Sequence, residues 1–206
     1  MEIRLYAGEG SASNTYLVRD EKTREAFIVD AGSFNHDLYV YAKERELNIK
    51  YLILTHGHGD HIGGVAEYRE AFPDMKVAAA VKEEEALKDP SLNYSREIWG
   101  RPVTVEPDIL VKDYDILRVA GLELLILETP GHTKGGISIL CEDALFSGDT
   151  LFKHSVGRTD LHGGSINELL KSIKEKLFTL PPETQVFPGH MGTTTIGYEK
   201  ENNPFV

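Results

Sequence analysis

The sequence predicts a layered fold of the α/β or α+β class. Short apolar runs typical of strands recur along the chain, and segments with apolar residues at helical spacing lie among them. Of the 206 residues, 41% are hydrophobic and 27% charged, which is the balance of an ordinary globular protein that can bury a full core. The length suits one sizeable domain or two small ones, and no low-complexity segment or obvious linker interrupts the chain.

The expected elements follow from local patterns. Strands are expected where short apolar runs end at turn residues, at 2–6, 14–18, 26–29, 50–54, 76–80, 116–119, 123–127, 137–141, 144–146 and 185–187. Helices are expected where apolar residues recur every three or four positions, at 37–46, 61–71, 82–88 and 167–178. Ser165 is a suitable cap for the last helix. Residues 89–107 are rich in turn residues and carry no predicted element.

Four of the hydrophobic runs lead into turns of the same kind. In each turn a glycine directly precedes a possible ligand, as Gly57-His58, Gly131-His132, Gly148-Asp149 and Gly189-His190. Strands of a layered fold can end at a common edge, and glycine lets the backbone turn tightly before the functional side chain. We therefore expect these three histidines and one aspartate to converge at one rim.

The strongest local signal is the motif Thr-His-Gly-His-Gly-Asp-His at residues 55–61. In an extended turn His56 and His58 point to the same side, while Asp60 and His61 stand where the next helix begins. Imidazole and carboxylate are typical zinc ligands, and iron and manganese accept them too. The spacing matches a mechanistic motif, so a polar loop with coincidental histidines is the weaker interpretation.

Three further residues would complete a two-metal site. Taken alone, His132, Asp149 and His190 would each more often be structural, as a buried histidine or a turn-capping aspartate. Together they supply the ligands that the motif lacks. Five histidines and two aspartates divide into two sets of three, with one carboxylate left to bridge.

These residues carry a family resemblance. His-x-His-x-Asp-His, followed by Pro-Gly-His, Ser-Gly-Asp and Pro-Gly-His, resembles the metal-binding pattern of the metallo-β-lactamase superfamily. Thr-Pro-Gly-His-Thr-x-Gly-Gly (129–136) and Phe-Ser-Gly-Asp-Thr-Leu-Phe (146–152) are similar to its glyoxalase II (hydroxyacylglutathione hydrolase) branch. The resemblance runs from about Asn14 to the C-terminus. It implies a four-layer αββα sandwich, a single domain over residues 1–206, with the metals at the edge of the two sheets.

The resemblance also implies a role for each ligand. The first metal would be held by His56, His58 and His132, the second by Asp60, His61 and His190, with Asp149 bridging them. Asp30 matches an acidic position after an early strand and would orient the ligand loop without touching a metal. A simple turn aspartate is an equally good interpretation of Asp30.

Such a site suits thioester hydrolysis. Two divalent ions, zinc by ligand type or else iron or manganese, would share a hydroxide at neutral pH, because metal-bound water loses its proton near pH ~7. One ion would hold the developing oxyanion. A thiolate leaves without a strong acid, since a free thiol has a pKa of about 8.5. Asp60 would act catalytically by orienting or accepting the proton, in addition to binding metal.

Residues at the substrate-binding positions match the glyoxalase II pattern less well than the metal-ligand motifs do. Longer glyoxalase II members carry a C-terminal helical domain that binds glutathione, and we expect this chain to lack it, since only residues 191–206 follow the last ligand. Gly192 replaces a family aromatic residue, and Asp160 replaces a tyrosine. Arg158 matches a glutathione-contacting position and is the candidate for a substrate anion, against the alternative of a surface ion pair. S-lactoylglutathione or a related thioester is the expected substrate.

Other functions remain as alternatives. A persulfide dioxygenase shares the Gly-Arg-Thr-Asp run at 157–160 and would hold one iron through His56 or His58, His132 and Asp149. A β-lactamase is disfavoured because many of those enzymes have cysteine where this chain has Asp149. An RNA-processing nuclease is disfavoured by the acidic chain without a basic arm. A non-catalytic module with a vestigial site is disfavoured by the complete ligand set.

Composition sets the remaining expectations. The net charge of −11 disfavours nucleic acid and anionic membranes as partners, and it decides nothing about a small-molecule substrate. Cys141 is the single cysteine, and no long apolar run follows Met1 or lies elsewhere. We therefore expect a cytoplasmic protein. The sequence carries no signal for the oligomeric state, for which a monomer or dimer is the expectation.

Overall fold

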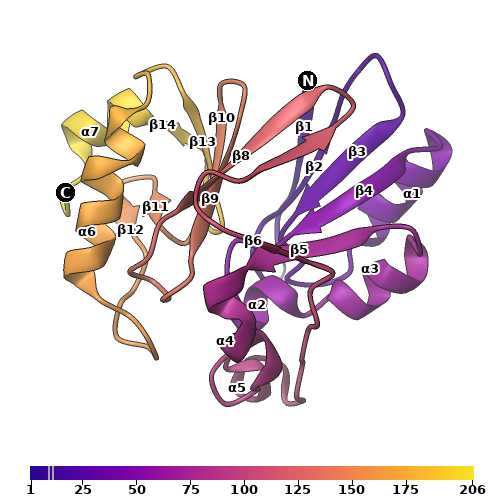
Figure 1. The fold of residues 1–206 in the computed structure, drawn as a ribbon, viewed down its shortest axis with the longest axis horizontal. Coiled ribbons are helices and arrows are strands. Elements are labelled where there is room, and N and C mark those ends of the chain that lie inside the picture. The colour runs from indigo at the N-terminus through magenta and orange to yellow at the C-terminus, as the bar shows by residue number, and fades with distance from the viewer. Residues whose placement is uncertain (9, 11) are drawn as a thin grey trace.

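Two six-stranded sheets form the centre of the computed structural model, which describes residues 1–8, 10 and 12–206 (Figure 1). In the first sheet the strands are neighbours in chain order, antiparallel from β1 to β3 and parallel from β3 to β6. They are β1 (Glu2–Tyr6), β2 (Thr15–Arg19), β3 (Glu25–Val29), β4 (Asn48–Ile53), β5 (Lys76–Ala80) and β6 (Ile109–Val111).

The second sheet has the order β14-β13-β10-β9-β8-β7. Its pairs are antiparallel except β10 with β13, which run parallel. Its strands are β7 (Ile116–Val119), β8 (Leu122–Glu128), β9 (Ile137–Cys141), β10 (Ala144–Gly148), β13 (Gln185–Pro188) and β14 (Thr194–Thr195). A separate hairpin pairs β11 (Leu151–Phe152) with β12 (Ser155–Val156).

Helices cover the outer face of each sheet. In Figure 1, α1 and α3 lie outside the first sheet, and α6 and α7 lie outside the second. The helices are α1 (His36–Glu44), α2 (Gly59–Ile62), α3 (Val65–Ala71), α4 (Glu84–Lys88), α5 (Ser95–Trp99), α6 (Ile166–Glu175) and α7 (Ile196–Asn202), with 3₁₀ turns η1 (Val81–Glu83) and η2 (Leu177–Thr179). Within the described residues, no helix combines the length and the apolar character needed to cross a membrane.

The alternation of strand side chains explains the layers. Along β4, Leu52 packs in the core beneath α1 and α3, whereas its neighbour Ile53 packs in the core between the two sheets. Phe27 of the first sheet meets Phe146 of the second there, with ring centroids 6.2 Å apart. A third core lies beneath α6. The predicted four-layer αββα sandwich is therefore confirmed, as one domain whose sheets share a core.

The predicted single helix over 61–71 is wrong. Residues Gly63 and Gly64 separate α2 from α3, and both glycines lie against another backbone segment. A Cβ on Gly63 would be 2.4 Å from the carbonyl oxygen of Gly32, and one on Gly64 would be 2.4 Å from the carbonyl carbon of Ser33. Close packing against residues 32–33 thus breaks the helix just after the ligand motif.

Other differences concern short elements. The predicted helix over 167–178 ends at Glu175, and the 3₁₀ turn η2 follows; Ser165 caps it as expected, accepting a hydrogen bond from the backbone N–H of Glu168. The turn-rich segment 89–107 contains α5. Neither α7 nor the strands β6, β11, β12 and β14 were predicted. Strands of two or three residues give too little alternation to be recognised.

Candidate metal centre

The loop after β4 and the helix α2 that follows it carry four of the candidate ligands, and Asp30 fixes the shape of this segment. Asp30 follows β3, the parallel neighbour of β4, so both strands end at the same edge. Its Oδ1 accepts a hydrogen bond from the backbone N–H of Thr55 at 2.8 Å. Its Oδ2 accepts one from the Thr55 hydroxyl at 2.8 Å and lies 2.9 Å from Nδ1 of His61. Asp30 thus connects the first and last residues of the motif.

The other candidate ligands follow strands of the second sheet. His132 lies in the loop after β8, Asp149 directly after β10, and His190 after β13. Glycine is required at two of these turns. Gly131 has a φ of +136°, and a Cβ on Gly189 would lie 2.3 Å from Oδ1 of Asp149. The absence of a side chain at Gly189 therefore leaves room among the ligands.

The structure brings all seven predicted ligands together at one edge of the sandwich. Their nitrogen and oxygen atoms form three overlapping groups, each with its atoms within 4.8 Å of one another. We call two of them the three-histidine group and the Asp60 group. The three-histidine group is His56, His58 and His132, and the Asp60 group is Asp60, His61 and His190. The third group, His56, His61 and Asp149, lies between them.

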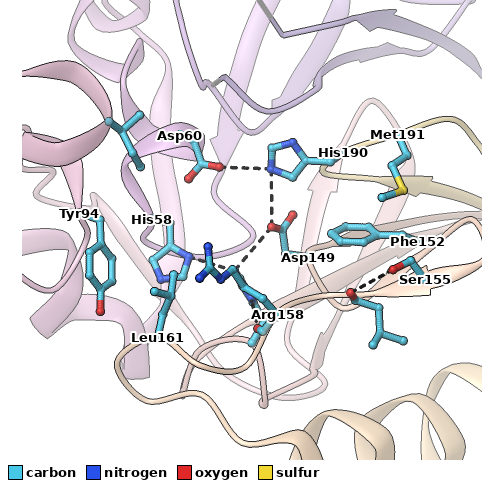
Figure 2. A pocket seen from close by; sticks show the side chains of 13 residues that line it. His58, Asp60, Tyr94, Asp149, Phe152, Ser155, Arg158, Leu161, His190 and Met191 are labelled. Atoms are coloured by element: carbon cyan, nitrogen blue, oxygen red, sulfur yellow. Dashed lines mark hydrogen bonds and ion pairs between the residues drawn. The ribbon is translucent and has the colours of Figure 1, made fainter. Parts of the chain in front are cut away.

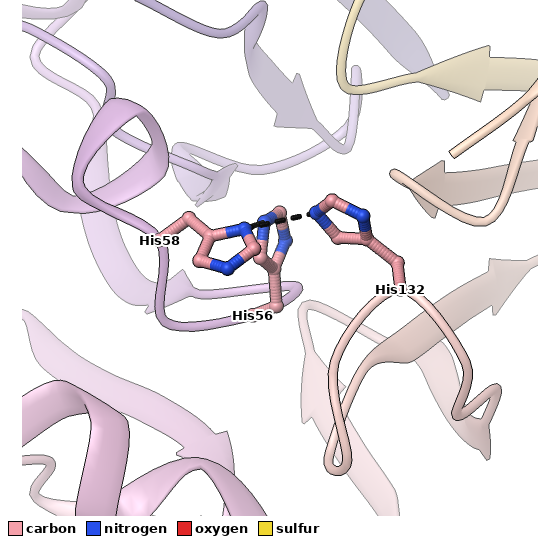
Figure 3. A group of neighbouring side chains, drawn as sticks. All are labelled: His56, His58 and His132. Carbon is pink, nitrogen blue, oxygen red and sulfur yellow. Dashed lines mark hydrogen bonds between the residues drawn. The ribbon is translucent and has the colours of Figure 1, made fainter. Parts of the chain in front are cut away.

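The three-histidine group is tightly packed and buried. Nδ1 of His58 lies 2.9 Å from Nε2 of His132 and 3.1 Å from Nε2 of His56 (Figure 3). All three rings are 5% exposed or less. The other nitrogen of His132 contacts the carbonyl oxygen of Arg158 at 2.7 Å, which sets the orientation of this ring.

Asp149 contacts both groups. Its Oδ1 lies 3.3 Å from Nε2 of His61, and its Oδ2 lies 3.5 Å from Nε2 of His132 and 3.6 Å from Nε2 of His190. The same His190 nitrogen is 3.2 Å from Oδ2 of Asp60 (Figure 2). Asp149 is therefore placed as a bridging carboxylate would be.

The donor set fits divalent cations. Four buried side-chain atoms of the described residues have no hydrogen-bond partner, and two of them are Nε2 of His61 and Oδ1 of Asp149, which lie 3.3 Å apart without forming a hydrogen bond. Unpaired buried polar atoms are costly and rare, and both of these point into the ligand cluster. Nitrogen and carboxylate donors that converge in this way match the preferences of zinc and of iron or manganese.

Burial keeps the first motif histidines neutral in the metal-free protein. Burial lowers the pKa of His56, and the nearby imidazole of His61 adds to this effect. Burial and the neighbouring His132 lower the pKa of His58 to about 3. Both rings are uncharged at neutral pH, the form that binds metal.

The Asp60 group has the opposite tendency. Burial disfavours the charged form of His61, but the charges of Asp149, Asp30 and Asp60 outweigh it and raise the pKa well above its usual range. Burial likewise opposes protonation of His190, and its hydrogen bond to Asp60 raises the pKa nonetheless. Burial would raise the pKa of the Asp60 and Asp149 carboxyls, but the cationic His61 lowers both. A cation bound here must displace protons.

A cavity of about 480 Å³ opens beside the cluster (Figure 2). The candidate ligands His58, Asp60, His132, Asp149 and His190 form one wall. Most of the remaining lining is apolar or aromatic, namely Tyr94, Ile98, Phe152, Val156, Leu161 and Met191, with Ser155 and Arg158. Such a lining suits an organic substrate with an apolar portion.

Arg158 lies at this cavity but is already paired. Its Nε and one terminal nitrogen donate to the two oxygens of Asp160, both at 2.7 Å. The two side chains are 61% and 67% exposed, so solvent weakens the pair and leaves Arg158 able to exchange partners. Of the described residues that line the cavity, Arg158 is the one lysine or arginine.

Several residues of the site were not predicted from the sequence. Tyr94 comes from the turn-rich segment before α5, and no pattern there indicated a role. Met191 follows the ligand His190 directly, and this adjacency was a usable signal. Met191 has a φ of +68°, and its carbonyl accepts a hydrogen bond from the Asn14 side chain at 3.0 Å.

Comparison with known proteins agrees with this geometry. The model of the family described as "Metallo-beta-lactamase superfamily" matches residues 8–190, which include all seven candidate ligands. The chain belongs to the metallo-beta-lactamase superfamily. Its curated relatives include probable metallo-hydrolases, and the histidine-rich cluster is the candidate metal site of this chain.

Two curated relatives cover nearly the whole chain. The probable metallo-hydrolase YqgX of Bacillus subtilis is 39% identical over 206 residues, covering 98% of this chain and 96% of YqgX. The hydroxyacylglutathione hydrolase GloC of Haemophilus influenzae is 32% identical over 214 residues, covering 100% of this chain and 98% of GloC.

Solved structures show the same fold. BLEG-1, described as a B3 metallo-beta-lactamase, has a TM-score of 0.92 and 38% identity, with 99% of each chain covered. ETHE1 from Myxococcus xanthus has a TM-score of 0.82 and 32% identity, covering 99% of this chain and 84% of ETHE1. TTHA1623, in a di-iron-bound form, has a TM-score of 0.81 and 32% identity, covering 94% and 95%.

Proposed function

We propose that this member of the superfamily is a two-metal hydrolase that splits small-molecule thioesters into an acid and a thiol, as glyoxalase II enzymes do. One observation carries the proposal: Asp149 faces both the three-histidine group and the Asp60 group at the wall of a largely apolar cavity. The GloC relative supports thioesters as the substrate class. Zinc is the metal that we propose, and the same donors accept iron or manganese.

The two ligand groups would each bind one metal ion. The three-histidine group would hold one ion and the Asp60 group the other, with Asp149 reaching both. Bound there, the two ions supply an activated water at neutral pH and a Lewis acid for the thioester carbonyl. Asp30 and the Arg158 carbonyl hold the His61 and His132 rings in the orientations that this requires.

Other side chains would handle the substrate. Asp60 lines the cavity as an ionised carboxylate and can orient or accept a proton at its oxygens. Phe152, Leu161 and Met191 would exclude water from the acyl group. The leaving thiolate needs no acid from the protein, because the pKa of a free thiol is about 8.5. Arg158 would bind an anionic part of the thiol.

A metal-exchange assay tests the proposal. Protein stripped with a chelator and protein reloaded with Zn²⁺ are compared on S-lactoylglutathione, an uncharged thioester, an oxygen ester and a β-lactam. We expect thioester turnover that disappears on stripping and returns on reloading, with slower turnover of the other compounds. Turnover that chelation leaves unchanged, or preference for the β-lactam, contradicts the proposal.

One other activity has an observation in its favour. The fold match to ETHE1 at 32% identity, together with the Gly-Arg-Thr-Asp run at 157–160, supports a persulfide dioxygenase as the second candidate. Iron would then be held by His132, Asp149 and one motif histidine. Oxygen uptake on addition of glutathione persulfide to the iron-loaded protein distinguishes the two, because a hydrolase consumes no oxygen.

The net charge and the cavity volume favour a small molecule over nucleic acid as the partner. A net charge of −11 disfavours nucleic acid, and the cavity of about 480 Å³ has room for a small molecule. A cytoplasmic monomer or dimer is part of the same proposal.

A further inference from the structure

Three carboxylate residues of the described chain are buried, and two of them, Glu83 and Glu199, have no part in the proposed chemistry. Asp30 follows β3 and holds the ligand loop through Thr55 and His61, Glu199 lies near the C-terminus, and Glu83 lies at the end of η1, which follows β5. Glu83 is 2% exposed. A buried carboxylate is costly unless its oxygens accept several hydrogen bonds, so its partners indicate what it does.

Glu83 connects the two loops that carry the three-histidine group. Its Oε2 accepts the backbone N–H of Gly57 at 2.7 Å, and Gly57 stands between His56 and His58. Its Oε1 accepts the backbone N–H of Gly135 at 2.8 Å, in the loop of His132. One side chain thus joins a loop of the first sheet to a loop of the second.

The surrounding backbone is shaped for this contact. A Cβ on Gly135 would lie 2.7 Å from the backbone nitrogen of Glu83, and one on Gly57 would lie 3.0 Å from its Oε2. The loop of Gly135 is itself short and closed, since the N–H of Thr129 donates to the carbonyl of Gly136 at 2.8 Å. Any shift of Gly135 therefore moves His132 as well.

We propose that Glu83 is a positioning residue for the three-histidine group: its carboxylate sets the spacing between His56 and His58 on one side and His132 on the other. Charge-assisted hydrogen bonds to two backbone N–H groups hold the loops more rigidly than apolar packing would. The proposal rests on the proposed function only in that the three-histidine group binds a metal ion. Among the described residues, no hydrogen bond or ion pair joins Glu83 to the Asp60 group, so we expect the metal affinity of that group to change much less.

Zinc binding to the stripped protein tests this role. We expect Glu83→Gln to weaken Zn²⁺ binding at one site by about 10-fold or more while the other site stays within about twofold. The amide oxygen of the introduced glutamine can accept a hydrogen bond from only one of the two loops. The NH₂ group of the glutamine then faces the backbone N–H donor of the other loop. The weakened site is assigned by comparison with His132→Ala and His190→Ala, and Glu83→Gln is expected to resemble His132→Ala.

Glu199→Gln is the matched control. Glu199 is 1% exposed and accepts hydrogen bonds from Thr194, Asn203 and the backbone of His154, none of which is a candidate ligand. We expect Glu199→Gln to lower the melting temperature without changing either Zn²⁺ affinity. Equal loss at both sites in Glu83→Gln, or no loss, overturns the positioning role.

Two further measurements test the proposal even if Glu83→Gln fails to fold. Glu83→Asp keeps the charge but is one methylene shorter, so we expect it too to weaken the three-histidine site. In the wild-type protein stripped of metal, the amides of Gly57 and Gly135 are expected to exchange slowly with solvent, and rapid exchange of either overturns the proposal. A wild-type protein that binds no Zn²⁺ at the three-histidine group overturns the proposed function as well.

Discussion

At the scale of single residues, the two ligand groups differ mainly in their charge before metal arrives. The rings of His56 and His58 are neutral because burial and neighbouring imidazoles depress their pKa values. His61 and His190 are protonated more readily, because carboxylates around them outweigh burial. The first group is ready to bind a cation, whereas the second must lose protons first.

This difference predicts unequal pH dependence. The raised pKa values of His61 and His190 mean that protons compete with metal below those pKa values, so affinity at the Asp60 group should rise with pH. We expect a steep rise at this site from about pH 6 to 8 and a flatter one at the three-histidine group. Zn²⁺ titrations across this range measure both, and parallel slopes would argue against the assignment.

The Arg158–Asp160 pair predicts a shift in substrate preference. Asp160→Asn releases the guanidinium from its carboxylate partner, so we expect kcat/KM for an anionic thioester to rise about twofold to fivefold relative to an uncharged one. Arg158→Gln should change the ratio in the opposite direction. Steady-state assays with the two substrates measure the ratio. An unchanged ratio in both variants would show that Arg158 does not bind the substrate.

Functional residues could be predicted from the sequence only where their spacing formed a recognisable motif. Histidine and aspartate in a dense motif, or after glycine at strand ends, indicate ligands regardless of the details of the fold. Glu83 and Tyr94 carried no such mark, since their importance arises from loops that meet only in the folded chain. Asp160 was noted as a departure from the family, but its pairing with Arg158 depends on the conformation of an exposed loop.

At the scale of elements, strand ends and tight turns deliver the ligands. β4 leads to the motif, β8 to His132, β10 to Asp149 and β13 to His190, so each ligand loop is anchored by a hydrogen-bonded strand. These long strands were predictable from apolar runs. The break between α2 and α3 was not, because it results from packing against residues 32–33 rather than from periodicity.

The turn before His190 provides a test. In Gly189→Ala the new methyl group would lie 2.3 Å from Oδ1 of Asp149 and 2.7 Å from Cε1 of His61, so ligands must move. We expect total Zn²⁺ affinity to fall about 10-fold or more, as for other disturbances around a metal site. Competition with a chromophoric chelator measures the loss.

Gly192→Ala is the control for this turn, because a Cβ there meets nothing within 4 Å. We expect near wild-type affinity from it. If both alanine variants bind Zn²⁺ as the wild type does, Gly189 does not limit the space among the ligands.

At the scale of the whole molecule, the core between the sheets holds the two halves of the centre together. Phe146 has no exposed surface and packs against Tyr16, Phe27 and Phe187, with centroid distances of 5.4, 6.2 and 5.4 Å. The two ligand groups draw on both sheets, so their geometry depends on this packing. The layered architecture was predictable from the element pattern and the family resemblance, but the aromatic contacts within it were not.

Opening this core should therefore cost stability. We expect Phe146→Ala to lower the free energy of unfolding by about 3–5 kcal/mol, because it leaves a cavity between the sheets. Phe205→Ala, at a side chain 55% exposed, should change it by about 0.5 kcal/mol or less. Denaturant unfolding measures the free energy of unfolding of both variants. Similar losses in the two would show that Phe146 does not belong to the main core.

The most direct test of the two-metal centre is anomalous X-ray diffraction from crystals of the zinc-loaded protein. We predict two peaks about 3.5–4 Å apart, one within the three-histidine group and one within the Asp60 group, both in contact with Asp149. A single peak, or metal bound away from Asp149, would contradict a dinuclear hydrolase.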